Sequence, residues 1–346
     1  MSVTIKDVAK KANVSISTVS LVINNHPKIS KSTRKQVLKT IEELNYHPSR
    51  QARGLVSKKT GNLGFIITED HFSRAEPFYT KVFLGTEFES RDLEYYILLT
   101  TVPPQFHEDS QLPRFILEKN VDGVILAGKI PRSLIDRLKF YKMTLVFVDY
   151  YLPDKNFPVV LIDNISGGYK ATMHLIESNH RKIAFIGGDI EHPSIVERFQ
   201  GYKLALEKSG IPFDPLLTVT DEPYLSPANG YQAAKKLFEQ TDDITAIFAS
   251  NDAMAFGVLQ FLKEHGKQVP DDISLIGFDD VDADLTLEPP LTTISVPKIE
   301  LGVEAIRLMI EKLQNPTATS RKVLVPVDLV VRGSTKMLTI PYAKIG

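Results

Sequence analysis

Apolar residues at the start of the chain recur with the spacing of short helices. One group falls at positions i, i+3, i+4 and i+7, which predicts a single apolar helical face; it comprises Ile5, Val8, Ala9 and Ala12. Thr4 and Asp7 have the spacing of a capping pair at the N-terminus of this helix. Asn13 can adopt the left-handed conformation that ends a helix, and Ser15 can cap a second one. The pattern therefore predicts two short helices joined by a tight turn.

The second helix is predicted to have an inward and an outward face. Val19, Val22 and Ile23 point back at the first helix, which leaves an outward face of Ile16, Ser17, Ser20 and Leu21. A helix pair this short, with basic neighbours, has the geometry of a helix-turn-helix that places its second helix in the major groove of DNA. Capping pairs are common, so this stretch alone also allows a small helical hairpin without a DNA-binding role.

A third helix and a short fourth segment are predicted before residue 60. Ser30 can cap a helix whose inward stripe is Val37, Leu38, Ile41 and Leu44. Residues 49–57 are helix-like but short, and Gly54 costs about 1 kcal/mol relative to Ala in a helix. This segment is therefore expected to be marginal as an isolated helix. Residues 58–61 are interpreted as the end of a linker.

From residue 63 the pattern changes to short apolar runs that alternate with helical patterns. The runs cover residues 63–68, 95–101, 121–127, 145–149, 159–163, 183–187, 246–250 and 273–278, and residues 323–331 are strand-like again. Helical patterns cover residues 167–177, 195–208, 229–239, 254–264 and 299–313. Continuous apolar runs are typical of parallel strands covered by helices on both faces. We therefore expect an α/β body of doubly wound parallel sheets, long enough for two lobes with a cleft between them.

Composition and charge narrow the functional classes. The 346 residues include no Cys, which excludes disulfides, thiolate catalysis and Cys-based metal sites. The polar N-terminus and the lack of an 18-residue apolar run indicate neither a signal peptide nor a membrane span, so we expect a cytoplasmic protein. Residues 1–60 carry 12 Lys and Arg against 3 Asp and Glu, whereas the remainder carries 29 against 39. A basic segment on an acidic body is typical of a head that binds a polyanion.

Sequence motifs of enzymes are absent. The chain has no glycine-rich phosphate loop, dinucleotide fingerprint or nucleophile elbow, and its eight His residues lack metalloprotease spacing. Gly187 and Gly188 follow an apolar run and are interpreted as a strand-exit turn rather than as a ligand contact. We therefore expect no catalytic residue, metal site or cofactor.

Polar side chains follow several of the apolar runs. Asp149, Asn251 and Asp279 come directly after predicted strands, and Arg198 lies in an early turn of a predicted helix. Ligands of doubly wound folds bind at the carboxyl ends of the strands, so these residues form a plausible set of hydrogen-bonding groups for a polar small molecule. For each residue taken alone, a helix cap or a surface ion pair is the commoner role.

These features together resemble the LacI/GalR family of transcriptional regulators over nearly the whole chain. In the head the match comprises Thr4-Ile5-Lys6-Asp7-Val8-Ala9, Val14-Ser15, Thr18-Val19-Ser20, Asn24, Thr33-Arg34 and Ala52-Arg53 with Leu55. In the body it comprises His180-Arg181-Lys182-Ile183, Arg198 with Gly201-Tyr202, Asn251-Asp252 with Ala255 and Gly257, residues 270–280, residues 289–294, and Arg332 with Ser334-Thr335.

The resemblance implies a cytoplasmic, nucleoid-associated repressor that binds a near-palindromic DNA operator as a homodimer. Residues 1–48 are then the helix-turn-helix domain, residues 49–60 a hinge helix and linker, and residues 61–346 the two-lobed body. The N-lobe is expected at about 61–161 and 292–322, and the C-lobe at about 162–291 and 323–340. The residues implied in DNA contacts are Thr4, Ser15, Ile16, Ser17, Thr18, Ser20, Leu21, Asn24, Ser30, Arg34, Tyr46, Ala52, Arg53 and Leu55. Leu55 is implied as an apolar wedge in the minor groove.

The resemblance also implies a small-molecule effector in the cleft, a sugar or sugar derivative. The implied contacts are Phe72, Asp149, Arg198, Leu225, Asn251 and Asp279. Leu21 departs from the common family pattern, in which Arg occupies this position, and it offers only apolar contact, such as with a thymine methyl group. The hinge is closest to the catabolite-control branch, which implies as an alternative a global regulator gated by a phosphorylated carrier protein. A transporter's solute-binding protein shares such a body but lacks a basic head.

Overall fold

The computed structural model describes residues 3–23, 26–46, 59–73, 78–154, 156–188, 190 and 192–339, with the side chains of Phe72 and Ser73 excepted. The chain forms two compact units, residues 1–62 with 114–122 and residues 63–113 with 123–346. In the described ranges, no helix combines the length and apolar character needed to cross a membrane.

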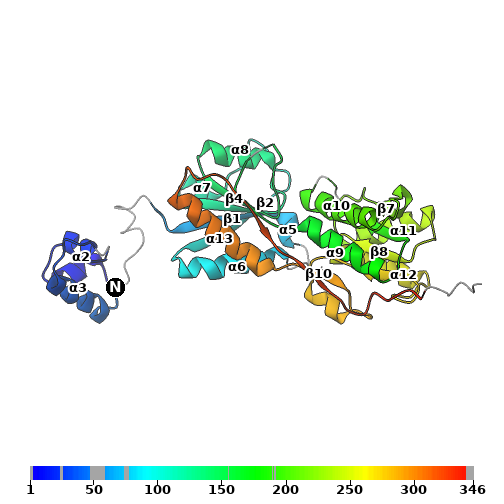
Figure 1. The fold of residues 1–346 in the computed structure, drawn as a ribbon. Coiled ribbons are helices and arrows are strands. Elements are labelled where there is room, and N and C mark those ends of the chain that lie inside the picture. Colours follow the sequence, from blue (N-terminus) through cyan, green and yellow to red (C-terminus); the bar gives the residue numbers. More distant parts are fainter. Residues whose placement is uncertain are drawn as a thin grey trace, which may run out of the picture. The chain divides into compact units, whose positions relative to one another are not determined.

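The smaller unit begins with the helices α1 (Ile5–Lys11), α2 (Ile16–Ile23) and α3 (Lys31–Glu43) (Figure 1). The backbone N–H of Thr4 donates to Oδ2 of Asp7 at 2.8 Å. Asn13 has a φ of 49°, and the N–H of Thr18 donates to Oγ of Ser15 at 3.0 Å. The predicted capping pair, left-handed turn and second cap are therefore confirmed.

A small apolar core holds these helices together. Its buried members are Val8, Ala9, Ala12, Val19, Val22, Val37 and Tyr46. The N–H of Thr33 donates to Oγ of Ser30 at 3.1 Å, which confirms the predicted cap of α3. The prediction that Leu38 points inward is wrong, since this side chain is 50% exposed. Each residue rotates an α-helix by about 100°, so Leu38 turns away when Val37 faces the core.

Asp122 holds the end of the predicted linker. Its carboxylate accepts the N–H of Thr60 at 2.7 Å and the N–H of Gly61 at 3.0 Å. The short helix α7 (Arg114–Leu117) belongs to the same unit. The predicted hinge helix at residues 49–57 lies outside the described residues.

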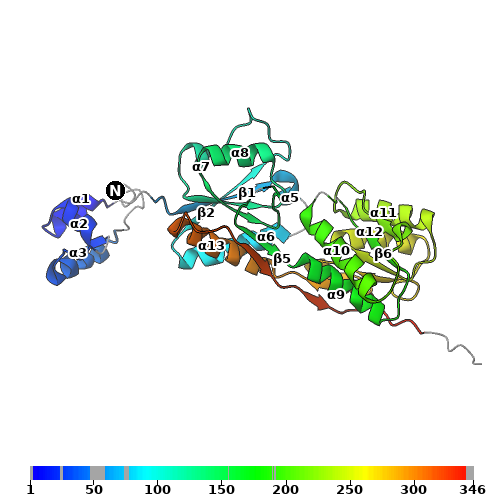
Figure 2. The same cartoon turned by 45° about the horizontal axis from the view of Figure 1, so that its top comes forward.

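The first lobe of the larger unit is built on a parallel sheet with the order β11-β5-β4-β3-β1-β2 in the described residues. The strands are β1 (Asn62–Thr68), β2 (Tyr96–Val102), β3 (Gly123–Ala127), β4 (Thr144–Val148), β5 (Val159–Ile162) and β11 (Lys322–Val325). α5 (Glu69–Ser73) follows β1. Figures 1 and 2 show α8 (Arg132–Phe140) on the opposite face of this sheet from α6 (Phe78–Asp92) and α13 (Lys298–Gln314).

The second lobe has a smaller parallel sheet with the order β7-β6-β8-β9. Its strands are β6 (Ile183–Ile186), β7 (Thr218–Val219), β8 (Ala246–Ala249) and β9 (Ser274–Ile276), and its helices are α9 (Asn164–Glu177), α10 (Pro193–Lys208), α11 (Pro227–Gln240) and α12 (Asp252–Glu264). The short 3-10 helices η1 (Pro215–Leu217) and η2 (Asp282–Thr286) lie in its loops. Phe185 packs with residues of α9 and α10, whereas Ile186 packs with residues of α11 and α12. The strands are therefore covered on both faces, and the predicted doubly wound fold is confirmed.

The chain passes between the lobes after β5, before α13 and between β11 and β12 (Asp328–Val330). β12 pairs with β10 (Thr293–Ser295) in an antiparallel ladder. One strand was expected over residues 323–331, with the C-lobe segment beginning at residue 323. Both expectations are wrong. Lys322 to Val325 pair with β5 in the first lobe. Pro326 follows, and because Pro has no backbone N–H the ladder ends there.

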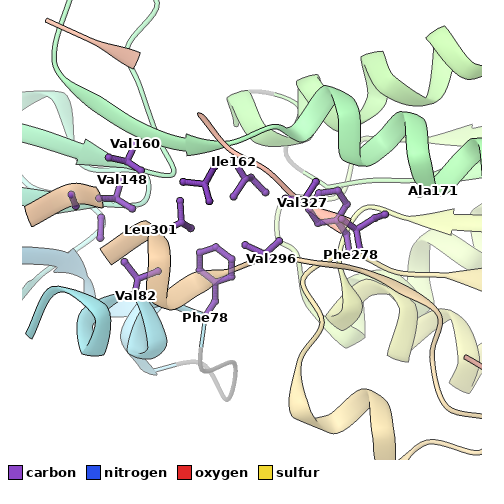
Figure 3. Close-up of a cluster of buried hydrophobic side chains, with 14 of the residues drawn as sticks. Phe78, Val82, Val148, Val160, Ile162, Ala171, Phe278, Val296, Leu301 and Val327 are labelled. Carbon is purple, nitrogen blue, oxygen red and sulfur yellow. The ribbon is translucent and has the colours of Figure 1, made fainter. Parts of the chain in front are cut away.

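A buried apolar cluster continues from one lobe into the other (Figure 3). Figure 3 shows Ile162, Val296 and Val327 between the side chains of the first lobe and Phe278 of the second. The segments that cross between the lobes are thus part of a shared apolar core. Packing in this core fixes the strand ends that face the cleft.

Candidate functional site

A cavity of about 550 Å³ lies between the two lobes of the larger unit. Five of the six predicted effector residues line it, namely Asp149, Arg198, Leu225, Asn251 and Asp279. The sixth, Phe72, lies in α5, and its side chain is outside the described residues. The structure therefore brings together groups from distant parts of the sequence at the carboxyl ends of the strands.

Asp149 follows β4 and is held from both lobes. The hydroxyl of Tyr79, on α6, donates to Oδ2 at 2.9 Å. The hydroxyl of Ser194, on α10, donates to Oδ1 at 3.2 Å. Burial raises the pKa of the Asp149 carboxyl, and the charge of Arg198 is the largest opposing influence. The carboxyl is thus oriented by two donors before any ligand arrives.

Arg198 is fixed by contacts on every side. Its Nη1 donates to the carbonyl of Ser250 at 2.7 Å, and its Nε donates to Oδ1 of Asn164 at 2.9 Å. Nη2 lies 3.5 Å from Oδ1 of Asp279. The guanidinium carbon lies 3.7 Å from the centroid of the Phe278 ring, the distance of a cation–π contact. The side chain is only 5% exposed, so its charge is presented to the cavity in one orientation.

Glycines allow the close helix packing that positions Arg198. A Cβ at Gly168, on α9, would lie 2.2 Å from the carbonyl oxygen of Arg198, and a Cβ at Gly201 would lie 2.3 Å from the carbonyl oxygen of Ile165. Either methyl group would push α10 away from α9. Because Gly168 and Gly201 have no side chain, α10 packs closely against α9, and this packing sets the distance between the Arg198 backbone and the cavity.

Asp279 sits after β9 in an unusual backbone conformation. Its φ is 118°, a region that costs a non-glycine residue about 1–3 kcal/mol. The N–H of Asp279 donates to the carbonyl of Ile294 at 2.9 Å, and Nζ of the buried Lys298 donates to the carbonyl of Asp279. Burial raises the pKa of Asp279 to about 6, against the opposing charges of Arg198 and Lys298, while Asp149 adds to the rise. Such strain and a perturbed carboxyl pKa are typical of functional sites.

Asn251 has two roles at the cavity wall. Its Oδ1 accepts the N–H of Met254 at 2.9 Å, which caps α12. Asn251 also lines the cavity. The common structural role of such a residue, a helix cap, is therefore present here together with access to the cleft.

Several lining residues were not predicted from the sequence. They include Asp70, His71, Tyr79, Lys129, Arg132, Tyr150, His192, Ser194 and Tyr224. Within the described part of the chain, Oδ1 of Asp70 is buried without a hydrogen-bond partner. Asp70 and His71 lie two and three residues after the end of β1, so the strand-end rule that found Asp149 could have found them. Tyr79 and Ser194 lie in helices and carry no such signal.

The head presents most of the predicted DNA contacts at helix ends or on outward faces. Thr4, Ser15 and Ser30 are at helix N-termini, Arg34 is on α3, and α2 carries Ile16, Ser17, Thr18, Ser20 and Leu21. Tyr46 is instead packed in the core with 7% of its surface exposed, which leaves little of this residue for a DNA contact. Asn24, Ala52, Arg53 and Leu55 lie outside the described residues.

Comparison with known proteins extends over the whole chain. Residues 4–49 match the family of bacterial regulatory proteins of the lacI type, and residues 172–335 match the periplasmic binding protein-like domain. Catabolite control protein A of Priestia megaterium is 36% identical over 97% of this chain and 100% of its own length. Among solved structures, the transcriptional regulator CelR in complex with cellobiose has a TM-score of 0.73 and 30% identity, covering 96% of this chain and 99% of that one.

A LacI-family transcriptional regulator from Enterococcus faecium with bound ribose has a TM-score of 0.69 and 28% identity, covering 80% of this chain and 100% of that one. These relatives are regulators of transcription rather than enzymes. The helix-turn-helix head, the two-lobed body and the full-length similarity agree with one another. The chain therefore belongs to the LacI family of bacterial DNA-binding transcriptional regulators.

Proposed function

We propose that the chain is a repressor whose affinity for its operator is set by a small carbohydrate bound between the two lobes. The observation that carries the proposal is the convergence of Asp149, Arg198, Asn251 and Asp279 on one cavity. Carboxylates and a guanidinium suit vicinal hydroxyl groups, because charge-assisted hydrogen bonds are about twice as strong as neutral ones. The buried Oδ1 of Asp70 is a further acceptor for a ligand hydroxyl group.

The aromatic lining suits the apolar faces of a sugar ring. Phe78, Tyr79, Tyr150 and Tyr224 all line the cavity. A site with mostly apolar walls and a few convergent polar groups is the usual form of a small-molecule site. The two related structures carry cellobiose and ribose, and they support a carbohydrate as the ligand class for this chain.

We propose further that the repressor acts as a homodimer on a near-palindromic operator. A two-fold operator matches the symmetry of two identical heads. The first lobe offers apolar surface for pairing with a second copy, since Leu84 and Phe88, one turn apart on α6, are 39% and 48% exposed. The neighbouring strand β2 lies at the edge of its sheet. Large exposed apolar groups beside an edge strand are typical of an interface.

The hinge is the proposed link between effector and operator. Residues 49–57 are short enough to require docking for helix formation, and Leu55 is the wedge that enters the minor groove. Effector binding shifts the relative orientation of the lobes, and this changes the spacing of two paired hinges. The shift in operator affinity is limited by the difference in effector affinity between the two lobe arrangements.

A second candidate is a global regulator gated by a phosphorylated carrier protein. The 36% identity to catabolite control protein A over nearly the whole chain favours it. In this case the carrier protein, rather than a sugar, raises or lowers operator affinity. The cavity would then hold at most an auxiliary ligand.

Operator binding in the presence of defined partners tests both candidates. A duplex selected from a random library by the full-length chain serves as the operator, and its affinity is measured with sugars, sugar phosphates, nucleobases and phosphorylated carrier protein. A shift of tenfold or more, about 1.4 kcal/mol, with a sugar alone supports the first candidate. A shift with the carrier protein alone supports the second. An operator affinity that no partner changes contradicts both.

A further inference from the structure

The outward face of α2 is unusual for a helix that reads DNA. Val19 and Val22 are buried in the head core, and Ile23 packs against it. With about 100° of rotation per residue, Ser17 and Leu21 lie opposite this core face. Leu21 is not part of the apolar core of the head, and Ile16 is 44% exposed. Leu21 therefore stands on the side of α2 away from its core, and Ile16 is exposed at the first residue of the helix.

Charge around α2 points to nucleic acid as the occupant of this face. α2 itself contains no charged residue, as its sequence ISTVSLVI shows. Its neighbour α1 carries Lys6, Lys10 and Lys11, and α3 carries Lys31, Arg34, Lys35 and Lys39. Lys and Arg on the flanking helices are suited to phosphates. α2 itself offers only uncharged side chains to the base edges.

The chemistry of base edges selects what this face can recognise. Guanine is read mainly by Arg or Lys, and adenine by Asn or Gln, through paired hydrogen bonds. Residues 16–23 contain none of these side chains. Apolar side chains distinguish only one feature of the major groove, the 5-methyl group of thymine. Ser17 adds a hydroxyl that accepts or donates and so discriminates weakly.

We propose that Ile16 and Leu21 read 5-methyl groups of pyrimidines in the major groove. The operator half-site carries thymine where these side chains touch it. Cytosine at the same place binds more weakly, and 5-methylcytosine restores the contact because its methyl group occupies the position of the thymine methyl. Methylation of such a cytosine therefore strengthens repression. The inference rests on the proposed function, since it requires α2 to lie in the major groove of an operator.

Single-group changes in the DNA test the proposal. The full-length chain selects duplexes from a random library, and each thymine of the selected half-site is then replaced singly by deoxyuridine, which removes only the methyl group. We expect a loss of affinity of about fourfold at the contacted positions, which corresponds to about 0.8 kcal/mol for one buried methyl group. At the same positions we expect 5-methylcytosine to bind more tightly than cytosine by a similar factor.

Protein variants assign the effect to the two side chains. Leu21→Ala and Ile16→Ala should each bring the ratio of thymine to deoxyuridine affinity to about one at their own position. Leu38→Ala is the matched control, because Leu38 is an aliphatic residue of the same head that is 50% exposed on α3. The readout is a ratio within each variant, so partial unfolding changes both affinities equally. Leu21→Arg should move the selected base at its position to guanine.

Three results overturn the inference. One is a deoxyuridine scan that leaves affinity unchanged at every position of a selected operator. Another is a thymine preference that persists in full in Leu21→Ala and Ile16→Ala. The third is a selection that enriches no DNA sequence at all. This result contradicts operator binding itself, so it distinguishes failure of the proposed function from failure of the proposal that Ile16 and Leu21 read methyl groups.

Discussion

Nη2 of Arg198 lies 3.5 Å from Oδ1 of Asp279, and the two side chains are only 5% and 7% exposed. Arg198 comes from a helix of the second lobe, and Asp279 follows a strand of the same lobe at the edge of the cavity. The remaining contacts of Arg198 with Asn164 and Ser250 fix its orientation. The pair therefore presents a preorganised charge to a ligand, and two of the predictions below depend on it, the pH dependence of stability and the effector response of Arg198→Ala.

The stability of the protein should depend on pH through Asp279. Its pKa is raised to about 6 from the ordinary value of 3.8, so the folded state binds the proton more tightly than the unfolded state. This stabilisation is fully present below pH 3.8 and is lost as the pH rises to about 6, with a total change of about 3 kcal/mol. Urea unfolding of the wild type and of Asp279→Asn between pH 4 and pH 7 measures it.

The pKa of Asp284 is also raised to about 6, but Asp284 is present in both the wild type and Asp279→Asn. The difference in stability between the two proteins therefore reports the contribution of Asp279. The stability advantage of the wild type over Asp279→Asn should fall with rising pH. Asp328→Asn is the control, since the Asp328 side chain is 86% exposed. A difference that is constant or grows with pH contradicts the account.

Tyr79→Phe should weaken the site and the fold together. Tyr79 donates to Oδ2 of Asp149 at 2.9 Å, and a hydrogen bond to a charged group is worth about 1.5–3 kcal/mol. Loss of the donor should also raise the pKa of Asp149 further. Denaturant midpoints report the stability change, with Tyr141→Phe as control because Tyr141 is 40% exposed. Equal midpoints for the two variants would mean that the hydrogen bond has no net effect.

The basic head should make operator affinity strongly dependent on salt. Residues 1–60 carry 12 Lys and Arg against 3 Asp and Glu. The logarithm of affinity falls with the logarithm of salt concentration with a slope of about −0.9 for each neutralised phosphate. Titration of the full-length chain across salt concentrations gives this slope directly. A flat dependence would remove the basis for a polyanion-binding head.

Leu55→Ala should separate specific from non-specific binding. Insertion of Leu55 costs a few kcal/mol of base unstacking. The contacts of both hinges offset this cost on operator DNA but not on random-sequence DNA. We expect the variant to lose about tenfold or more in operator affinity and to lose the central DNA kink, while random-sequence affinity is retained. Gel-shift titrations and a DNA-bending assay measure these quantities. An unchanged kink with unchanged operator affinity would rule out Leu55 as the wedge.

The sequence predicts the parts of the fold that depend on local patterns. The caps at Thr4, Ser15 and Ser30 are as expected, because each depends on residues three positions apart. β7 and β10 were not predicted, since these strands of two and three residues contain only one apolar residue each, Val219 and Ile294, and so form no apolar run. The strand predicted over residues 323–331 is divided between two sheets, because Pro326 ends one ladder and the chain then crosses to the other lobe.

Some residues of the candidate site could likewise be predicted from the sequence, and others could not. Asp149, Asn251 and Asp279 could be predicted because each follows a parallel strand, and ligands of such folds bind at the carboxyl ends of the strands. Tyr79 and Ser194 could not, since both reach Asp149 from helices whose placement depends on packing between distant segments. The strained φ of Asp279 likewise follows from tertiary contacts with Ile294 and Lys298, which leave no trace in the residues around it.

The most direct test of the proposed function is operator affinity with and without the effector for the wild type and Arg198→Ala. Lys203→Ala, an exposed change on the same helix, is the control. The account predicts a shift of tenfold or more with effector in the wild type and control, about 1.4 kcal/mol. In Arg198→Ala it predicts no shift, with effector-free operator affinity within about twofold of the wild type. A normal effector response in Arg198→Ala would contradict the account.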